Sequence, residues 1–389
     1  MGYNNKNIKS LKDCYGCGMC AVSCPPKIIS IKRNTNGFFE PHIINDNMCV
    51  GCGLCLKVCA FNDKALSVDN SPIGSYAAWS NDSKTRKACS SGGVMYEIGK
   101  YMLDKAYYIC AVKYDNETKQ AIHYIASNEI ELRESRGSKY LQSYSVEALK
   151  ALDFNRKVVF VGTPCQVDSL RRYVRIRNKE DNVLFVDFFC HGVPSYNVWK
   201  AYCDIIEKDC GNILDVSWRD KENGWHDSWR MRIKGEIKSI VSSLSGGDIF
   251  YKIFLSDTCL NKACYKNCKY KYNKSAADIR IGDMWGYTYN KNEEGVSAVV
   301  CFTPQGADVI SHTNCQIVEH LFEEVAEGQM KKSPKYNLFV NYVQRLVSNE
   351  ASLHRIAKLC GLYISYNNMV YLFSHPAYFR RKIKNYIYK

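Results

Sequence analysis

The sequence predicts two folds in series, an α+β module over residues 1–70 and an α/β domain with a mostly parallel or mixed sheet over residues 71–320. A repeated cysteine array around one short hairpin predicts the first, and apolar strands that alternate with helical periodicity predict the second. The chain has 389 residues, which suffices for two or three domains at roughly 150 residues each. We assign residues 321–389 to a helical C-terminal extension with a basic tail.

Eight cysteines near the N-terminus form a repeat. Each half is spaced C-x2-C-x2-C-x3-C, and the second half is the first displaced by 35 residues. This is the pattern of bacterial two-cluster ferredoxins, in which three close thiolates hold one [4Fe-4S] cubane and the fourth crosses to the other cubane. The pattern assigns one cluster to Cys14, Cys17, Cys20 and Cys59, and the second to Cys49, Cys52, Cys55 and Cys24.

Zinc is the alternative metal for these cysteines. Tetrahedral zinc sites use pairs of C-x2-4-C knuckles, whereas this array has triplets followed by a fourth cysteine after three residues. Pro25 follows Cys24, as the iron–sulfur pattern expects, although Ala60 follows Cys59. The spacing therefore favours iron–sulfur clusters.

The segment between the two cysteine sets alternates apolar and polar residues. Residues 28–31 and 38–44 flank Asn36-Gly37, a dipeptide typical of a hairpin turn. Turn-forming residues at 68–74 then end the module near residue 70.

Composition narrows the class of protein. The 20 cysteines follow no apolar signal segment, and no apolar run approaches 18 residues, so we expect a cytoplasmic, metal-binding protein without a transmembrane segment. The net charge of +14 favours binding to an acidic partner. Thiolate-ligated clusters are anionic, however, and offset part of this positive charge. Because no nucleic-acid-binding motif accompanies the charge, we expect no nucleic-acid partner.

The α/β domain opens with a turn, Cys89-Ser90-Ser91-Gly92-Gly93, before a helix that begins near Val94. Such a turn offers free amides and hydroxyls to an anion, and an ordinary N-cap is the alternative. The following elements are predicted as strands at residues 107–114, 121–126, 157–162 and 183–189, and as helices after residue 166 and at 199–206. Strands alternating with helices place sites at the carboxyl ends of the strands.

Two of these strands end in a cysteine-bearing turn. Cys165 is either a nucleophile, with His191 as its base, or a metal ligand, and Cys190 lies in the matching turn of the next strand. Three more cysteines, Cys259, Cys264 and Cys268, cluster before the segment 277–286. A third four-thiolate cluster explains more of these five cysteines than a nucleophile does.

The segments 162–166, 190–192 and 277–286, together with the Cys264/Cys268 pair, resemble the beta subunit family of coenzyme F-420 hydrogenases and dehydrogenases. The turns 89–93 and 136–143 resemble its other signatures, and the resemblance covers roughly residues 8–315. It implies an α/β domain that binds FAD and a [4Fe-4S] cluster, with the ferredoxin repeat as an N-terminal fusion. The implied cluster ligands are Cys165, Cys190, Cys264 and Cys268; the implied flavin contacts are Gly92, Gly93, Ser138, Lys139, Tyr140 and Ser143.

The sequence departs from the family pattern at one spacing. Three residues separate Cys264 from Cys268 where two are expected, so Cys259 competes for one ligand position. Coenzyme F-420 itself does not follow from the resemblance, since the family includes members with no known deazaflavin. Residues 218–221 with Gly224-Trp225 look like a bacterial branch of undefined substrate, and core packing and an exposed Arg219–Asp220 ion pair are the alternatives.

A flavin carries two electrons as a hydride and a cluster carries one, so the predicted cofactors suit an oxidoreductase that converts between the two. We expect an iron–sulfur flavoprotein that exchanges electrons with ferredoxin or another redox protein and has an undefined small-molecule substrate. The alternatives are an electron-transfer subunit of a larger redox complex and a basic zinc or nucleic-acid-binding module.

The C-terminal tail, residues 376–389, has five basic residues and no acidic one. Its apolar residues, including Phe379 and Ile383, fall on one helical face. We expect a terminal helix docked on the domain, with peripheral contact to anionic lipid or to an acidic partner as the alternative.

Overall fold

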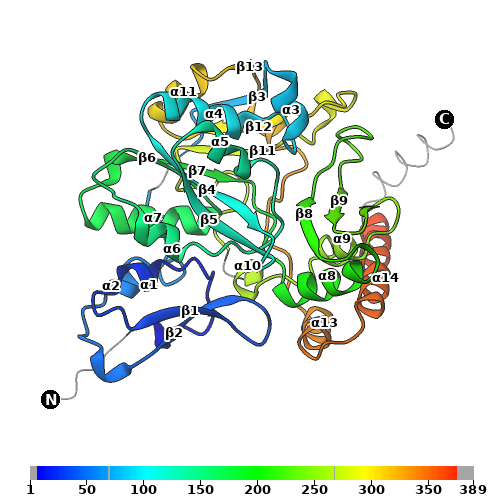
Figure 1. Ribbon diagram of the computed structural model, residues 1–389, viewed down its shortest axis with the longest axis horizontal. Coiled ribbons are helices and arrows are strands. Elements are labelled where there is room, and N and C mark those ends of the chain that lie inside the picture. Colours follow the sequence, from blue (N-terminus) through cyan, green and yellow to red (C-terminus); the bar gives the residue numbers. More distant parts are fainter. Residues whose placement is uncertain (1–6, 69–70, 267, 375–389) are drawn as a thin grey trace.

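The computed structural model describes residues 7–68, 71–266 and 268–374 (Figure 1). The described chain forms three bodies: an N-terminal module, a central eight-stranded sheet with helices, and a lobe built on a three-stranded sheet whose strands are inserted in the sequence between strands of the central sheet. The basic tail, residues 376–389, lies outside the described residues. No helix in the described part of the chain is long and apolar enough to cross a membrane.

The N-terminal module contains the predicted hairpin and a short helix in each half of the cysteine repeat. Strands β1 and β2 pair antiparallel, with Ile29 opposite Ile43, which confirms the hairpin. Both helices begin immediately after a glycine in the left-handed region, Gly18 with φ +77° and Gly53 with φ +69°, so the two halves use the same turn. The elements are η1 (Ile8–Ser10), α1 (Met19–Ser23), β1 (Ile29–Arg33), β2 (Phe39–Ile43), η2 (Asp46–Met48) and α2 (Leu54–Lys57).

The central sheet is mixed, in the order β13-β3-β12-β11-β7-β6-β4-β5. Strands β4, β6, β7 and β11 are parallel to their neighbours in this set, and antiparallel strands complete both sides. The predicted mixed α/β sheet is therefore confirmed. The strands are β3 (Gly74–Ser80), β4 (Tyr108–Asp115), β5 (Gln120–Ala126), β6 (Val158–Val161), β7 (Val183–Phe188), β11 (Ile279–Asp283), β12 (Ser297–Cys301) and β13 (Cys315–Glu319).

Both faces of this sheet are buried, as its continuous apolar strands predict. Val159 on β6 packs with α4 and α11 on one face, whereas its neighbours Val158 and Phe160 pack with α6 and α7 on the other. The N-terminal module lies on the second face, because Met19 and Val58 join that core. The helices of this body are α3 (Ser83–Ala88), α4 (Val94–Asp104), α5 (Glu129–Leu132), η3 (Arg133–Ser135), α6 (Val146–Ala151), α7 (Pro164–Ile176), η4 (Glu180–Asn182), η5 (Tyr287–Tyr289), α11 (Pro304–Ser311) and α12 (Phe322–Val325).

The lobe combines residues from two separated stretches of chain. Val343 and Ile356 of the C-terminal helices share one core with Trp199, Trp218 and Phe250, so these helices pack on residues 196–260. The predicted helix at 199–206 is longer in the structure and begins at Tyr196, where the Ser195 hydroxyl accepts a hydrogen bond from the Asn197 amide. The elements are α8 (Tyr196–Cys210), β8 (Ile213–Ser217), β9 (Arg230–Gly235), β10 (Ser239–Ser243), α9 (Ile249–Phe254), α10 (Lys262–Lys266), α13 (Leu338–Ser348) and α14 (Leu353–Ser374).

Candidate functional site

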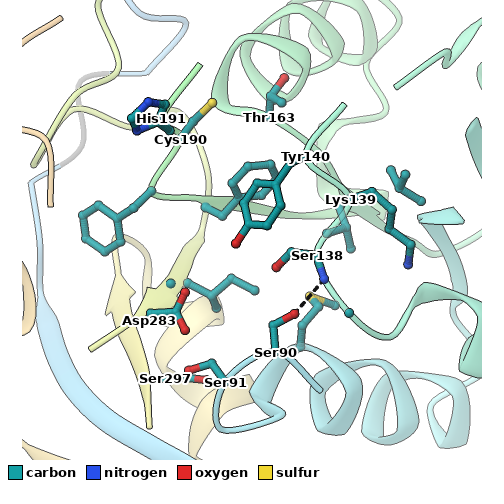
Figure 2. A pocket seen from close by; sticks show the side chains of 18 of the residues that line it. Ser90, Ser91, Ser138, Lys139, Tyr140, Thr163, Cys190, His191, Asp283 and Ser297 are labelled. Carbon is teal, nitrogen blue, oxygen red and sulfur yellow. Dashed lines mark hydrogen bonds between the residues drawn. The ribbon is translucent and has the colours of Figure 1, made fainter. Parts of the chain in front are cut away.

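A cavity of about 520 Å³ lies along the carboxyl ends of β6, β7 and β11 and beside β4 (Figure 2). Val161, Phe188 and Ile281 line it from the ends of these three strands. Parallel strands that end at one edge leave a crevice between the loops that follow them, which is where ligands bind in open α/β sheets. The cavity therefore occupies the place that the strand pattern predicts.

One end of the cavity is formed by two turns that the sequence places far apart. The backbone N–H of Ser138 donates to the Ser90 hydroxyl at 2.8 Å, which joins the turn 89–93 to the segment 136–143. The Ser91 hydroxyl donates to the carbonyl of Val296 at 2.7 Å. The turn supplies the N-cap of α4, Gly93, as the alternative to an anion site expects, but no side chain caps this helix. The amino end of α4 remains able to attract an anion at this end of the cavity.

Two half-buried lysines add positive charge beside these turns. The Lys139 ammonium donates to the carbonyls of Glu134 and Arg136, and the Lys221 ammonium donates to those of Ser91 and Glu294. Burial lowers the pKa of Lys139 to about 7 and that of Lys221 to about 8, because the charged form loses hydration. An anion in the cavity would favour the charged form of both.

Behind the cavity wall lies a buried arginine that contacts several of the lining residues. The Arg219 guanidinium lies 4.9 Å from the ring centroids of both Trp229 and Trp285. It donates to Asp283 at 3.1 Å and to the Tyr140 hydroxyl at 3.1 Å, and its side chain is 0% exposed. The predicted alternative of an exposed Arg219–Asp220 ion pair is therefore wrong, since Arg219 pairs with Asp283.

Five of the six residues expected to contact a flavin line this cavity, namely Gly93, Ser138, Lys139, Tyr140 and Ser143. Gly92 does not. Its amide donates to the Ser297 hydroxyl, its carbonyl accepts from the Ser80 amide, and it packs against β3 and β12 behind the wall. The sequence reasoning did not place Asp283, Trp229 and Trp285 at the site, although Asp283 and Trp285 lie within the segment 277–286 that it singled out.

Substitution of Gly92 by alanine tests this packing role. A Cβ atom at this position would lie 2.4 Å from the carbonyl oxygen of Ala78 and 2.8 Å from the amide of Ser297, both backbone atoms. We expect Gly92→Ala to lower the free energy of unfolding by about 1–3 kcal/mol, the usual cost of overpacking. Urea unfolding measures it. Gly361→Ala on α14 is the control, because nothing lies within 4 Å of its Cβ position, and it should stabilise the protein or leave it unchanged. Equal effects of the two substitutions would contradict the packing role.

A second, smaller cavity shares a wall with the first. Cys165 reaches it from the first turn of α7, Cys190 from the end of β7, and Cys264 and Cys268 from α10 and the segment after it. Thr163, Gln166, Cys190, Val193 and Lys271 are among the residues that line both cavities. The structure thus brings together the four thiols that the family resemblance implied.

Cys259 lies elsewhere. It is 1% exposed, belongs to the lobe's core and lies near Cys360, whose thiol raises the pKa of Cys259 after the larger effect of burial. It does not line the thiol cavity, so the four cysteines that do are Cys165, Cys190, Cys264 and Cys268.

The structure also weighs against Cys165 as a free nucleophile. Burial raises its pKa well above the ordinary value, whereas a nucleophilic thiol needs a lowered one. The Cys165 sulfur lies 3.1 Å from the Thr163 hydroxyl, while the expected base, His191, pairs with Asp257 at 2.7 Å. A buried thiol without a cationic partner suits a metal ligand, since the metal supplies the charge that keeps it deprotonated.

The N-terminal cysteines fall into two neighbourhoods. After burial, the largest influence on the pKa of both Cys14 and Cys59 is the Cys17 thiol, which raises both and places Cys59 beside the first triplet. The Cys24 and Cys52 thiols in turn raise the pKa of Cys55, again after burial. Cys59 therefore lies beside Cys14 and Cys17, and Cys24 lies beside Cys55, as the predicted exchange of the fourth ligands requires. All 20 cysteines are free, and no three Cys, His, Asp or Glu groups within the described ranges are placed to hold a single ion.

Tyr15 links this module to the thiol cavity. It follows Cys14 in the chain, lines the cavity, and packs with Cys165 and Cys268 and against Tyr270 at 5.9 Å between ring centroids. The Gln142 amide holds this contact in place by donating to the Tyr15 carbonyl at 2.9 Å. The first cysteine set, the thiol cavity and the large cavity thus lie in sequence through the protein.

Comparison with known proteins agrees with this arrangement. Residues 13–62 match a 4Fe-4S dicluster domain, which overturns the zinc alternative, while residues 75–150 and 155–323 match the N-terminal and C-terminal parts of the family "Coenzyme F420 hydrogenase/dehydrogenase, beta subunit". Together these ranges include most of the residues that form both cavities.

Individual relatives are distant. Coenzyme F420 hydrogenase subunit beta from Methanococcus voltae is 27% identical over 290 residues, which are 68% of this chain and 94% of that protein. Coenzyme F420-dependent sulfite reductase from Methanocaldococcus jannaschii is 26% identical over 163 residues, 41% of this chain and only 25% of the reductase. A chain of the F420-reducing [NiFe] hydrogenase complex from Methanosarcina barkeri aligns over 74% of this chain and 91% of its own length, with 18% identity and a TM-score of 0.43.

The match of both parts of one family over residues 75–323, preceded by the dicluster domain, decides the family. This chain belongs to the coenzyme F420 hydrogenase/dehydrogenase beta subunit family and carries a 4Fe-4S dicluster domain at its N-terminus.

Proposed function

We propose that the protein is an iron–sulfur flavoprotein oxidoreductase that passes electrons between two [4Fe-4S] clusters of the N-terminal module and a hydride donor or acceptor at a bound FAD, by way of a third cluster. The shared wall between the thiol cavity and the large cavity carries this proposal. When bound, a flavin exchanges two electrons as a hydride and passes them on singly, and each cluster takes one.

The donor sets fit the clusters. Four half-buried thiols line one cavity, and thiolates are the ligands that iron–sulfur clusters use. Backbone N–H groups donate to several of the sulfurs. The Gly16 amide donates to Cys14 at 3.1 Å. The Gly192 amide donates to Cys190, and the Val193 amide donates to Cys264. Such donors stabilise thiolates, so we assign the third cluster to Cys165, Cys190, Cys264 and Cys268.

The large cavity fits FAD in size and polarity. Its volume of about 520 Å³ lies within the usual range of cofactor pockets. The Ser90–Ser138 end, with the amino end of α4 and two lysines, would hold the pyrophosphate, while the Tyr140 and Trp229 rings, 5.2 Å apart, flank the end that would take the ring system. Gly93, Ser138, Lys139, Tyr140 and Ser143 are the proposed contacts.

An electron-transfer subunit of a larger redox complex, without a substrate of its own, is the second candidate. The observation that favours it is the match over 94% of a relative that is itself named as a hydrogenase subunit. In that case the large cavity would serve the flavin and the hydride carrier alone. Coenzyme F420, for which the relatives are named, is the first hydride carrier to test.

Anaerobic purification followed by turnover assays tests the proposal and separates the two candidates. We expect about 12 Fe per chain from three four-iron clusters, together with one FAD. Reduction of an added ferredoxin by the isolated chain, with reduced F420 or nicotinamide as donor, supports an independent enzyme. Activity that appears only with added partner subunits supports the second candidate. A preparation with no flavin and no more than eight irons contradicts the proposal.

Binding of FAD is expected to depend on pH through Lys139 and Lys221. Because their pKa values are about 7 and about 8 in the flavin-free protein, both are charged at pH 6 and largely neutral at pH 9. We expect the dissociation constant of FAD to rise by about one to two orders of magnitude over this interval, since a charge-assisted hydrogen bond from Lys139, which lines the cavity, contributes about 1.5–3 kcal/mol and Lys221 adds its charge from behind the wall. Fluorescence titration of the flavin-free protein measures it.

The free energy of unfolding of the flavin-free protein should rise over the same pH interval, whereas the affinity for FAD falls. The unfolded chain keeps both lysines protonated up to about pH 10, so it binds more protons than the folded state above pH 7, and stability rises with pH there. A dissociation constant that stays flat between pH 6 and pH 9 would contradict a role for these charges in binding.

A further inference from the structure

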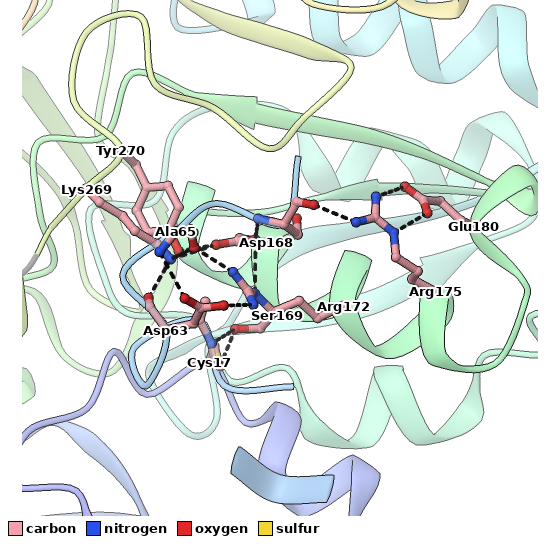
Figure 3. Close-up of polar contacts among 12 residues, drawn as sticks. Cys17, Asp63, Ala65, Asp168, Ser169, Arg172, Arg175, Glu180, Lys269 and Tyr270 are labelled. Carbon is pink, nitrogen blue, oxygen red and sulfur yellow. Dashed lines mark hydrogen bonds and ion pairs between the residues drawn. The ribbon is translucent and has the colours of Figure 1, made fainter. Parts of the chain in front are cut away.

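Helix α7 touches both the thiol cavity and the N-terminal module. It carries Cys165 in its first turn and Ser169 one turn later. The Ser169 side chain is buried, with 0% exposure, and its oxygen lies 3.3 Å from the Cys17 sulfur (Figure 3). The same oxygen accepts a hydrogen bond from the Ala60 amide at 3.3 Å. A hydroxyl of the α/β domain therefore contacts Cys17 and the residue after Cys59, two cysteines assigned to one cluster.

The direction of the Ser169–Cys17 bond follows from the chemistry of a ligated thiol. A hydroxyl has one hydrogen to donate and two lone pairs, and the Ala60 N–H occupies one lone pair. A cysteine that ligates iron is a thiolate without a hydrogen, so the Ser169 O–H must be the donor. A donor to a cluster sulfur stabilises the reduced cluster, which carries one more negative charge, more than the oxidised cluster.

A dense polar network holds Ser169 in this position. The neighbouring carboxylate of Asp168 is 0% exposed and accepts hydrogen bonds from the Ser67 amide at 2.8 Å and the Tyr270 hydroxyl at 2.7 Å. Lys269 and Arg172 lie 3.2 and 3.3 Å from it and compensate its charge.

The same two cations also bind the last turn of the N-terminal module, residues 63–67. Arg172 pairs with Asp63 at 2.7 Å and donates to the Ala65 carbonyl at 2.6 Å, where Lys269 donates as well. The segment 63–67 is thus fastened to α7. The distance between Ser169 and Cys17 is therefore set by contacts between the two bodies.

We infer that Ser169 is a positioning residue through which the α/β domain raises the reduction potential of the cluster assigned to Cys14, Cys17, Cys20 and Cys59. The inference rests on the cluster assignment of the proposed function. Its consequence is that the cluster nearest Tyr15 and the thiol cavity is easier to reduce than it would be in a module not docked on α7.

A redox titration of the full-length protein, followed by electron paramagnetic resonance, tests the inference. Dithionite supplies one electron to each cluster. We expect Ser169→Ala to lower the equilibrium constant for reduction of one cluster about tenfold, which is about 59 mV for a one-electron couple, and to leave the other clusters unchanged. Ser169→Thr keeps the hydroxyl and should retain the wild-type potential, whereas Ser169→Val has the same shape without a hydroxyl and should reproduce the alanine shift.

Ser145→Ala is the matched control. Ser145 is 2% exposed and its hydroxyl also donates to Cys17, but to the backbone carbonyl, at 2.8 Å, and not to the sulfur. The Ser145→Ala substitution removes an equally buried hydrogen bond between the same two bodies, so the reduction potential of the cluster should stay at the wild-type value. Equal shifts in Ser145→Ala and Ser169→Ala, or equal potentials in the threonine and valine variants, would overturn the inference while the clusters stand. A wild-type protein without the N-terminal clusters would instead overturn the proposed function and this inference with it.

Discussion

Substitution of Cys165 by serine is expected to remove about four of about twelve irons per chain, because one cubane loses a ligand. The N-terminal clusters should remain, since Cys165 lies in the thiol cavity on α7 and not in the cysteine repeat. Electron transfer from reduced flavin to those clusters should then fall by orders of magnitude, because the shared wall no longer holds a redox centre. Iron analysis and rapid-mixing absorption spectroscopy of the anaerobic protein measure both effects.

Cys259→Ser is the matched control for this result. Cys259 is as buried as a ligand would be but lies in the lobe's core near Cys360, away from the thiol cavity. We expect it to keep its full iron content. If Cys259→Ser loses the same four irons and Cys165→Ser keeps them, the ligand assignment of the third cluster is wrong. If neither loses iron while alkylation of native Cys165 is fast, Cys165 is a free nucleophile.

Replacement of Arg219 by methionine is expected to lower the free energy of unfolding by about 3–5 kcal/mol, the usual result of leaving one partner of a buried ion pair without the other. Among the described residues, the Trp225 indole N–H, at 3.0 Å, would be the donor that remains to the Asp283 carboxylate. The substitution also removes the hydrogen bond to Tyr140 and the cation beside the Trp229 and Trp285 rings. We therefore expect weaker FAD retention together with the loss of stability.

Urea unfolding and flavin content after gel filtration measure the two effects. Lys200→Ala is the control, because Lys200 pairs with Asp204 at 3.2 Å with both side chains largely exposed. Surface pairs of this kind contribute between about 0 and 1 kcal/mol. An Arg219→Met protein as stable as Lys200→Ala would show that the Arg219–Asp283 pair does not hold the cavity wall together.

The sequence alone was sufficient wherever a local pattern carries the physics. The cysteine repeat is such a case, since ligands two residues apart need a tight turn, and the match to a dicluster domain over residues 13–62 agrees with it. The strands β6 and β7 are a second such case. A short apolar run that is followed by a turn and a capped helix predicts a buried strand with little ambiguity. These two strands also predicted that Cys165 and Cys190 meet at one sheet edge.

The lobe and the cavity wall were decided by contacts between distant segments. From the sequence, Arg219 belonged either to a motif of undefined substrate or to an exposed ion pair with Asp220, and only the fold brings it within 3.1 Å of Asp283, 64 residues away. The family resemblance implied that Gly92 contacts the flavin, yet the close backbone of β3 explains that glycine. A short motif does not distinguish a glycine that approaches a ligand from one that approaches another strand.

The sequence by itself therefore determined the dicluster domain, and it placed Cys165 and Cys190 at one edge of the sheet, because both results follow from spacing and from strand direction. Only the tertiary structure decided between Cys259 and the other four thiols, and only it brought Ser169 to the Cys17 sulfur, 152 residues away. The physical reason is that a side chain's partner across a domain interface depends on how two independently patterned bodies pack. That packing is set by the whole buried surface and its polar clamps, such as Asp168 with Ser67, and not by any local run of residues.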